Sequence, residues 1–497
     1  MRRFASLERP EGIARNTAFA YGVQITTSVF TAALTVFLVR ALEPDGYGLL
    51  ALALAVGGLV SIPSDLGISG SAARFVAESR TNRTEAARVV SDSLVLKMTA
   101  SVVTSTALFL SADWVAAGYD EPNLAWPLRG VAVALFGHSV MNLCRAVFSA
   151  LGRNSINLKL VFSESAIETG ASIGLVLLGA GATGAAFGRA IGYGCGAAIG
   201  LVLVVATLGG GSLRLRQFRW PRARRLARYA GVLALVDGAW IAFTQVDALV
   251  LGAFLGAGAV GVYAAPLRLV AFLQYSGLAV ATAVTPRLAR SEEEPSAVPA
   301  FVASIRYLIV FQALLIAPLL VWAGPITELL LGPGYEESAD VLRALTPFVF
   351  LSGVSPLLSL AANYLGEARR RVPIAVGTLA VNLALALALV PTVGIVGAAI
   401  ATDVAYAIYV PAHLWICRRL LDVPLRPILI SLGRAAAAAT VMSGVLAAVG
   451  TSDLGLGQWI VGGIAGTASF LAVLVVTREL GRAELATLRS ALGRVRS

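Results

Sequence analysis

The chain has 497 residues, of which 57% are apolar and 13% are charged, and its formal net charge is +11. Because soluble globular proteins carry roughly a quarter charged residues, this composition excludes an ordinary soluble domain. The excess of basic residues does not indicate nucleic-acid binding, since the arginines and lysines lie between long apolar runs and do not cover a polar surface. A run of about 20 apolar residues can cross a bilayer as a helix, and the chain supplies many such runs.

The apolar runs, taken in chain order, predict an all-α polytopic membrane protein with about fourteen transmembrane helices. Pro63, Lys97 and Arg129 interrupt the second, third and fourth runs but do not exclude them, because neighbouring helices satisfy the backbone groups that a proline frees. The predicted spans are 16–40, 46–66, 89–112, 124–150, 158–180, 183–208, 229–255, 260–284, 301–324, 342–364, 373–392, 395–416, 428–449 and 457–477.

The charges divide the segments between these helices into two sets. Cytoplasmic loops collect Lys and Arg, and with the N-terminus inside, 32 of the 39 basic residues fall in or beside inside segments. Outside loops carry acids such as Glu43, Asp45 and Asp120. The densest basic segment, from Arg214 to Arg228, holds seven arginines and no acid and becomes a cytoplasmic loop. We therefore expect a multi-pass protein of the inner or plasma membrane with both termini in the cytoplasm.

An internal repeat relates the two halves of the chain at an offset close to 213 residues. The matches are Leu42/Gly48/Ala51 with Leu255/Gly261/Ala264, Arg74 with Arg287, Gly184-Ala185-Ala186 with Gly397-Ala398-Ala399, and Leu151-Gly152 with Leu365-Gly366. Each repeat holds six helices, an even number, so both begin on the same side and are related by a two-fold axis along the membrane normal. The predicted organisation is an N-lobe (1–208), a basic inter-lobe loop (209–228), a C-lobe (229–416), two further helices (427–477) and a basic cytoplasmic tail (478–497).

Three stretches of the sequence resemble a known family. "FLVRALEPDGYGLLALA" and "SDLGISGSAARFVAE" resemble the start of the polysaccharide flippases, and "QVDALVLGAFLGAGAVGVYAAPLRLV" resembles the start of their second lobe. These exporters belong to the multidrug/oligosaccharidyl-lipid/polysaccharide (MOP) superfamily. The resemblance covers essentially the whole chain and implies two lobes around a central cavity that opens alternately to each side. It also implies a lipid-diphosphate-linked oligosaccharide as cargo, for surface polysaccharides such as O-antigen.

Other functions stay open beside this one. They are a cation-coupled multidrug antiporter, a peptidoglycan lipid-precursor flippase, and a membrane scaffold or glycan polymerase. The chain has no Walker lysine after a glycine loop, no H-E-x-x-H and no long outer loop for catalytic carboxylates, so we expect no enzyme. Cys144, Cys195 and Cys417 lack metal or disulfide spacing. We expect no cofactor, metal or nucleic-acid partner; the expected partners are the lipid-linked oligosaccharide, membrane lipids, H⁺ or Na⁺, and glycan-assembly proteins.

Cations within the spans are candidates for binding the diphosphate of such a cargo. Charges at membrane depth usually face a cavity or a partner, and arginine binds phosphate through two parallel donors. Arg268 is the first candidate, and a structural ion pair with Asp247 is its alternative. Lys97 is the second, although its long side chain can also reach the inner face. Arg40 and Arg129 lie near the outer ends of their spans and can instead anchor the membrane interface.

Acids within the spans are candidates for binding a driving cation. Glu164 and Glu168 lie four residues apart and therefore on one face of the fifth span. Two carboxylates on one face repel each other, so one of them can hold a proton. The alternative is that they neutralise Arg189 or Arg145. Asp247, deep in the seventh span, is the third candidate, and H⁺ or Na⁺ would be the coupling ion.

Overall fold

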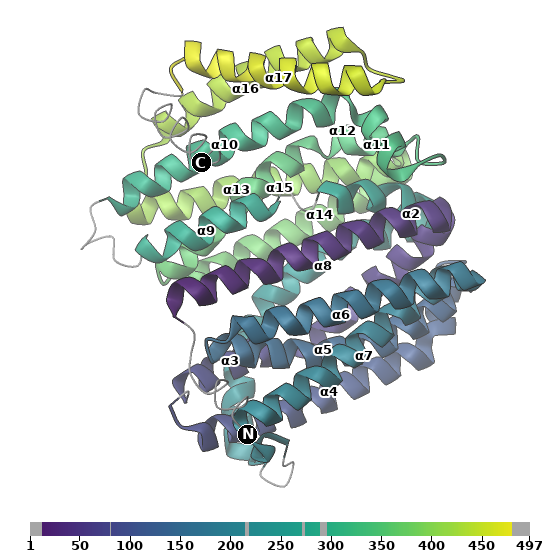
Figure 1. Ribbon diagram of the computed structural model, residues 1–497, viewed down its shortest axis with the longest axis vertical. Helices are drawn as coiled ribbons and strands as arrows, with labels where there is room; N and C mark the ends of the chain where they lie inside the picture. Colours follow the sequence, from purple (N-terminus) through teal and green to yellow (C-terminus); the bar gives the residue numbers. More distant parts are fainter. Residues whose placement is uncertain (1–11, 80, 214–217, 271–273, 289–295, 480–497) are drawn as a thin grey trace. The chain divides into compact units, whose positions relative to one another are not determined.

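The computed structural model describes residues 12–79, 81–213, 218–270, 274–288 and 296–479. Every regular element in these ranges is helical, as Figure 1 shows. The main helices are α2 (Ile13–Asp65), α3 (Ile68–Glu78), α4 (Arg83–Gly118), α5 (Ala125–Ala150), α6 (Asn154–Leu175), α7 (Gly181–Leu208), α8 (Trp220–Val270), α9 (Gln274–Leu288), α10 (Ala297–Val321), α11 (Ala323–Leu331), α12 (Ser338–Ala344), α13 (Thr346–Tyr364), α14 (Arg371–Val393), α15 (Ile395–Leu421), α16 (Leu425–Val449) and α17 (Leu456–Val476).

The lengths and composition of these helices confirm the predicted class. Eleven helical segments in the described residues are long and apolar enough to cross a membrane. Two of them, Arg15–Asp65 and Asn154–Leu208, have 51 and 55 residues, more than twice the roughly 20 that one crossing requires. The protein is therefore an all-α polytopic membrane protein, and the exact number of fourteen crossings stays a prediction.

Helix α2 reverses direction at Glu43. This residue has φ 59° and ψ 176°, which interrupts the helix. Near the start of α2, Asn16 Oδ1 accepts a hydrogen bond of 3.0 Å from the backbone N–H of Asn154, the first residue of α6. Near the end of α2, the hydroxyls of Ser64 and Ser139 lie 3.3 Å apart, and Ser139 belongs to the second half of α5. Both ends of α2 thus lie toward the place where α5 passes into α6, so α2 forms a hairpin of two predicted spans.

Helix α8 has the same interruption at the equivalent position of the second repeat. Gly256 follows Glu43 by 213 residues and has φ 81° and ψ −179°. The two turns share a backbone conformation that the sequence match alone did not reveal. The common conformation supports the predicted repeat with an observation independent of residue identity.

The two equivalent turns also contact each other reciprocally. A Cβ atom on Gly48 would lie 1.8 Å from the backbone oxygen of Ala257, and a Cβ on Gly261 would lie 2.0 Å from the backbone oxygen of Pro44. Only glycine allows the backbones to approach this closely. Each repeat therefore supplies one glycine and one carbonyl to a pseudo-symmetric contact.

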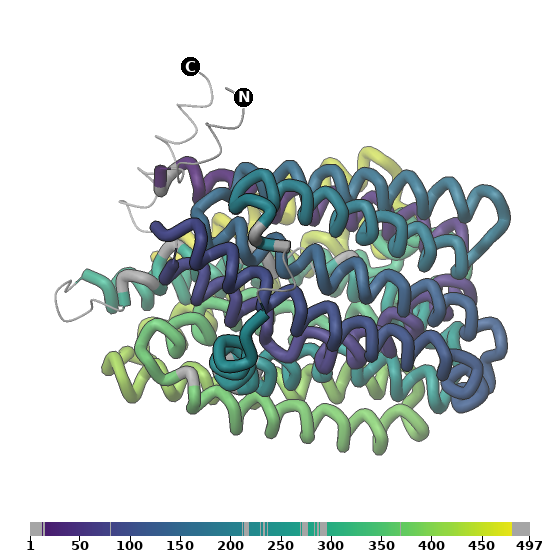
Figure 2. Tube along the Cα trace, turned by 90° about the horizontal axis from the view of Figure 1, so that it is seen from below, coloured from purple at the N-terminus to yellow at the C-terminus, as the bar shows by residue number. Residues whose placement is uncertain are grey.

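The described chain forms two compact units. The first comprises residues 1–265 and 383–395, and the second comprises 266–382 and 396–497. In the first unit, α4, α5, α6 and α7 run along one another in both views (Figures 1 and 2). The second half of the predicted basic loop is helical from Trp220, because Pro221 suits a first helical turn and Ala, Leu and Arg are good helix formers. The predicted lobe boundaries stay predictions.

In the second unit, helix ends that the charges predict to be cytoplasmic contact one another, and helix ends predicted to be outside also contact one another. The predicted inner ends of α10 and α17 meet where Arg306 Nη2 lies 2.8 Å from Glu479 Oε1. At the predicted outer ends, Trp322 Nε1 donates a hydrogen bond of 2.9 Å to the backbone oxygen of Gly450. Trp322 also packs edge-on against Trp459, with ring centroids 5.0 Å apart. These contacts fasten the hairpin of α16 and α17 to α10 at both ends.

Candidate functional site

Helices α6 and α7 pack closely because α7 carries a glycine at every fourth residue. A Cβ on Gly192 would lie 2.6 Å from Glu168 Cβ, and a Cβ on Gly196 would lie 3.0 Å from Glu164 Cγ. Small residues at this spacing allow membrane helices to approach each other. The glycines therefore give the two carboxylate side chains of α6 their space between the helices.

Glu168 is neutralised by an arginine of α7. Arg189 Nε lies 2.7 Å from Glu168 Oε1, and both side chains are largely buried. The Arg189 guanidinium also lies 5.7 Å from the centroid of the Tyr193 ring, which packs at 4.8 Å from the ring of His138 on α5. The predicted alternative, a structural pair between Arg189 and an acid of the fifth span, is thus confirmed for Glu168.

Glu164, unlike Glu168, forms no ion pair with an arginine or lysine among the described residues. Its side chain accepts a hydrogen bond of 3.1 Å from the Ser165 hydroxyl at Oε2. Its other oxygen, Oε1, is buried and receives no hydrogen bond from the described residues, and the residue is only 4% exposed. A buried charge without a partner is costly, so this environment suits a carboxyl group that holds a proton or another cation.

Lys97 is enclosed in a polar cluster at the break between α2 and α3. The break consists of Leu66 and Gly67, which have φ of 46° and 71°. The Lys97 ammonium pairs with the Asp65 carboxylate and donates a hydrogen bond of 2.9 Å to the Ser69 hydroxyl. Lys97 is fully buried, so it would have to exchange Asp65 for a cargo phosphate. Its predicted role in cargo binding stays a prediction.

The other predicted cations lie in different surroundings. Arg129 Nη2 lies 2.6 Å from Asp113 Oδ2, and its guanidinium lies 4.8 Å from the Trp126 ring centroid. This arrangement is typical of an anchor at the membrane interface. Arg40, near the end of the first half of α2, and Arg268, near the end of α8, are exposed. Their roles in cargo binding stay predictions.

Asp247 lies deep in α8 and accepts a hydrogen bond from a neighbouring tyrosine. Tyr263 Oη donates to Asp247 Oδ2 over 2.7 Å, and both residues are buried. This hydrogen bond compensates part of the cost of burying the carboxylate. The predicted pair of Asp247 with Arg268 and the predicted cation coupling at Asp247 stay predictions.

The sequence analysis did not predict the hydrogen bonds that hold the basic segment against α4. Asp92 of α4 is fully buried and accepts hydrogen bonds from the backbone N–H of Arg219 at 3.1 Å and from Arg222 Nε at 2.5 Å. Arg225 also lies 4.8 Å from the Phe75 ring centroid. The available signal was an acid in an apolar segment on the same predicted side as seven arginines. These contacts of Asp92 and Phe75 hold the start of α8 against α4 and α3.

The charged side chains of this site lie in pairs and small polar clusters between the membrane helices. The described ranges bring together no three His, Cys, Asp or Glu side chains that could hold a metal ion. An all-helical scaffold with paired intramembrane charges is typical of a polytopic membrane transporter. Residues 13–292, more than half of the chain, match the family model described as "Polysaccharide biosynthesis protein". The chain belongs to this family.

Two relatives cover most of the chain. A putative O-antigen transporter of Shigella flexneri is 22% identical over 425 residues, which are 81% of this chain and 97% of that protein. The probable low-salt glycan biosynthesis flippase Agl15 of Haloferax volcanii is 23% identical over 387 residues, 76% of this chain and 77% of that protein.

Solved structures share the fold. The lipid II flippase MurJ in an inward closed conformation has a TM-score of 0.72 and 13% identity, covering 94% of this chain and 100% of that chain. An inward-facing multidrug resistance MATE family transporter of the MOP superfamily has a TM-score of 0.66 and 16% identity, covering 80% and 95%. The predicted resemblance to the polysaccharide flippases is confirmed by the family match, and these solved structures share the fold.

Proposed function

We propose that the protein moves a lipid-diphosphate-linked oligosaccharide from the cytoplasmic to the outer leaflet of the cell membrane by alternating access. The family match carries the proposal, because one relative is named an O-antigen transporter and the other a glycan biosynthesis flippase. The charged head group of such a lipid cannot cross hydrocarbon unaided, so it requires a polar path through the protein. Glycan-assembly proteins would supply and receive the cargo.

Flipping is tested with the purified protein in proteoliposomes that contain a fluorescent lipid-diphosphate oligosaccharide. We expect the fraction accessible to an impermeant quencher to change with time in the presence of protein and to stay constant in empty liposomes. Transport of a cationic drug without flipping of the glycolipid would instead support the multidrug antiporter. Flipping of a peptidoglycan lipid precursor in preference to the oligosaccharide lipid would support the alternative that the protein is a peptidoglycan lipid-precursor flippase.

We propose that the basic segment and both termini lie in the cytoplasm, as the distribution of basic residues predicts. In a variant without the native cysteines, a cysteine at exposed Arg224 should resist an impermeant thiol reagent in intact cells. A cysteine at exposed Glu336, in a predicted outer loop, should react. The opposite labelling pattern would reverse the orientation and the direction of transport.

Transport is coupled to a proton at Glu164, with Glu168 and Asp247 as the other coupling candidates. Arg189 forms an ion pair with Glu168, whereas Glu164 Oε1 has no partner among the described residues and can accommodate a proton. Glu164→Gln imitates the protonated acid and should abolish the dependence of flipping on an imposed pH gradient, whereas Glu164→Asp should retain it. Asp247→Asn tests the role of Asp247 in the same assay. Dependence on Na⁺ in place of a pH gradient would contradict proton coupling.

The diphosphate is bound by Arg268, together with Arg40, Lys97 and Arg129 as further candidates. A charge-assisted contact to phosphate contributes roughly 1.5–3 kcal/mol, so Arg268→Ala should weaken cargo binding by about 10- to 150-fold. Arg268→Lys should fall between Ala and the unaltered protein, because lysine keeps the charge and loses the paired donors. Arg343→Ala is the control, since Arg343 is exposed and pairs with Asp340. Unchanged binding in Arg268→Ala would remove Arg268 from the cargo site.

A further inference from the structure

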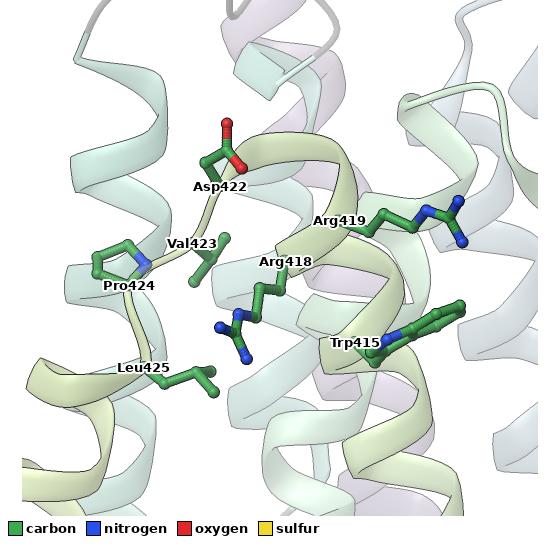
Figure 3. Close-up of a pocket in the computed structure, with 7 residues that line it drawn as sticks. All are labelled: Trp415, Arg418, Arg419, Asp422, Val423, Pro424 and Leu425. Carbon is green, nitrogen blue, oxygen red and sulfur yellow. The ribbon is translucent and has the colours of Figure 1, made fainter.

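A pocket lies in the second unit where α15 ends and α16 begins. Its volume is about 490 Å³, and its walls include two arginines and a tryptophan. Figure 3 shows Arg418 on the side of the loop where Val423 and Leu425 lie, while Arg419 lies beside Trp415. The Arg419 guanidinium is 5.6 Å from the centroid of the Trp415 ring, within the range of a cation–π contact.

The charges of this pocket suit a single anionic group. Arg418 and Arg419 are exposed, and neither forms an ion pair with a carboxylate in the part of the chain that the structure describes. Asp422 lines the same pocket, so the three side chains carry one net positive charge. Helix α16 begins at Leu425 without a capping side chain, and its first backbone N–H groups add donors at the same loop. One phosphodiester has the complementary charge and accepting oxygens.

The surroundings place the pocket at the level of lipid head groups. Trp415 is 55% exposed on a membrane helix, and exposed tryptophans gather at the boundary between hydrocarbon and water. Leu429, one turn into α16, is 62% exposed and offers an apolar surface for an acyl chain. Polar donors in the pocket, with an exposed leucine one turn further along α16, match a phospholipid better than a soluble phosphate, because only the lipid can contact both.

We propose that this pocket binds the phosphodiester head group of an anionic phospholipid such as phosphatidylglycerol. Arg418 and Arg419 donate to the phosphate oxygens, and Asp422 accepts a hydrogen bond from a head-group hydroxyl. Basic pockets between membrane helices on the cytoplasmic side are typical sites for anionic lipids. The inner leaflet as the source of the lipid rests on the proposed orientation, whereas binding itself does not.

The test measures thermal unfolding of the full-length protein in detergent micelles supplemented with phosphatidylglycerol. We expect phosphatidylglycerol to raise the unfolding temperature and phosphatidylcholine or inorganic phosphate to have no effect. The double variant Arg418→Gln/Arg419→Gln should require at least about tenfold more phosphatidylglycerol for the same shift. Arg426→Gln is the matched control, since Arg426 is exposed in the first turn of α16 and does not line the pocket.

Three results would overturn the proposal. Equal stabilisation by phosphatidylcholine would show that only the acyl chains matter, and equal stabilisation by inorganic phosphate would show a site for free phosphate. An equal loss in Arg426→Gln would show that the basic surface acts as a whole and not through this pocket. Because the assay measures no transport, its outcome is independent of whether the protein flips a glycolipid.

Discussion

Glu43 holds a backbone conformation that glycine alone adopts without strain. Its φ of 59° and ψ of 176° lie in a region where other residues cost of order 1–3 kcal/mol. We expect Glu43→Gly to stabilise the protein by about 1 kcal/mol, because the relief of strain exceeds the greater chain entropy of unfolded glycine. Thermal unfolding in detergent measures this, with Gly256→Ala as the destabilised counterpart. A lower unfolding temperature for Glu43→Gly would mean that the glutamate side chain contributes more than its strain costs.

Glu479 follows α17 and joins three helices at their predicted inner ends. Burial works to raise its pKa, but hydrogen bonds from Ser431, Arg306 and Arg434 outweigh burial and hold the pKa below its ordinary value of 4.5. The folded protein therefore gains stability from this carboxylate above pH 4.5 and loses it as the pH falls through the lower folded pKa.

Glu479→Gln should consequently lower the stability at neutral pH by about 1–3 kcal/mol. The difference between the two proteins should shrink below the ordinary carboxyl range, where the carboxylate of the unaltered protein becomes protonated. Unfolding temperatures measured between pH 3 and pH 8 check this expectation. A difference that does not change with pH would show that packing, and not charge, supplies the stability.

At the residue scale, the sequence indicates which charges need partners but seldom which partners they have. Glu168 and Arg189 were predicted as an alternative pair, because both lie in neighbouring apolar spans that must face each other. Lys97 and Asp65 also lie in spans, but the break at Leu66 that brings them together has no signal in the apolar pattern. The hydrogen bonds of Asp92 with Arg219 and Arg222 depend on how the basic segment packs against α4, and the sequence pattern does not reveal this packing.

At the scale of the helix, the face of α7 that carries Gly192 differs from the face that carries Gly194. A Cβ on Gly192 would lie 2.6 Å from Glu168 Cβ, whereas a Cβ on Gly194 would meet nothing within 4 Å. We expect Gly192→Ala to destabilise the protein by about 1–3 kcal/mol through overpacking. Gly194→Ala should be neutral or stabilising by up to about 1 kcal/mol, since alanine favours a helix. Equal unfolding temperatures for the two variants would contradict this packing.

The helices themselves follow the apolar runs closely, and the exceptions have physical reasons. The segment between the predicted spans 46–66 and 89–112 contains the helix α3, whose 11 residues are too few to span a membrane. The predicted span 260–284 falls on α8, described to Val270, and on α9, described from Gln274, and residues 271–273 of this span lie outside the described residues. Hydropathy averages over about 20 residues and so does not detect a local interruption such as the one at Leu66.

At the scale of the whole molecule, the paired turns around Gly48 and Gly261 lie at predicted outer ends of the two repeats. A Cβ on Gly48 would overlap a backbone oxygen that no side-chain rotation can move. Gly48→Ala should therefore favour conformations in which the two turns are apart, and each 1.4 kcal/mol of clash shifts the populations about tenfold.

The distance between spin labels at Ala41 and Leu255, both exposed beside these turns, reports this shift. We expect longer distances in Gly48→Ala and no change in Gly231→Ala, because a Cβ on Gly231 would meet nothing within 4 Å. An unchanged distance distribution in Gly48→Ala would show that the turns do not separate during transport.

The position of Glu479 in the chain has a consequence for biosynthesis. The ribosome makes Arg306 well before the carboxylate that it binds, because 173 residues separate the two. Until Glu479 is synthesised, α10 and α16 carry Arg306 and Arg434 without this shared carboxylate. A nascent chain therefore completes this ion pair only after α17 has been translated, and a premature stop before Glu479 leaves both arginines without this carboxylate. Such truncated chains should be poorer in folded protein and more susceptible to cellular proteases than full-length chains.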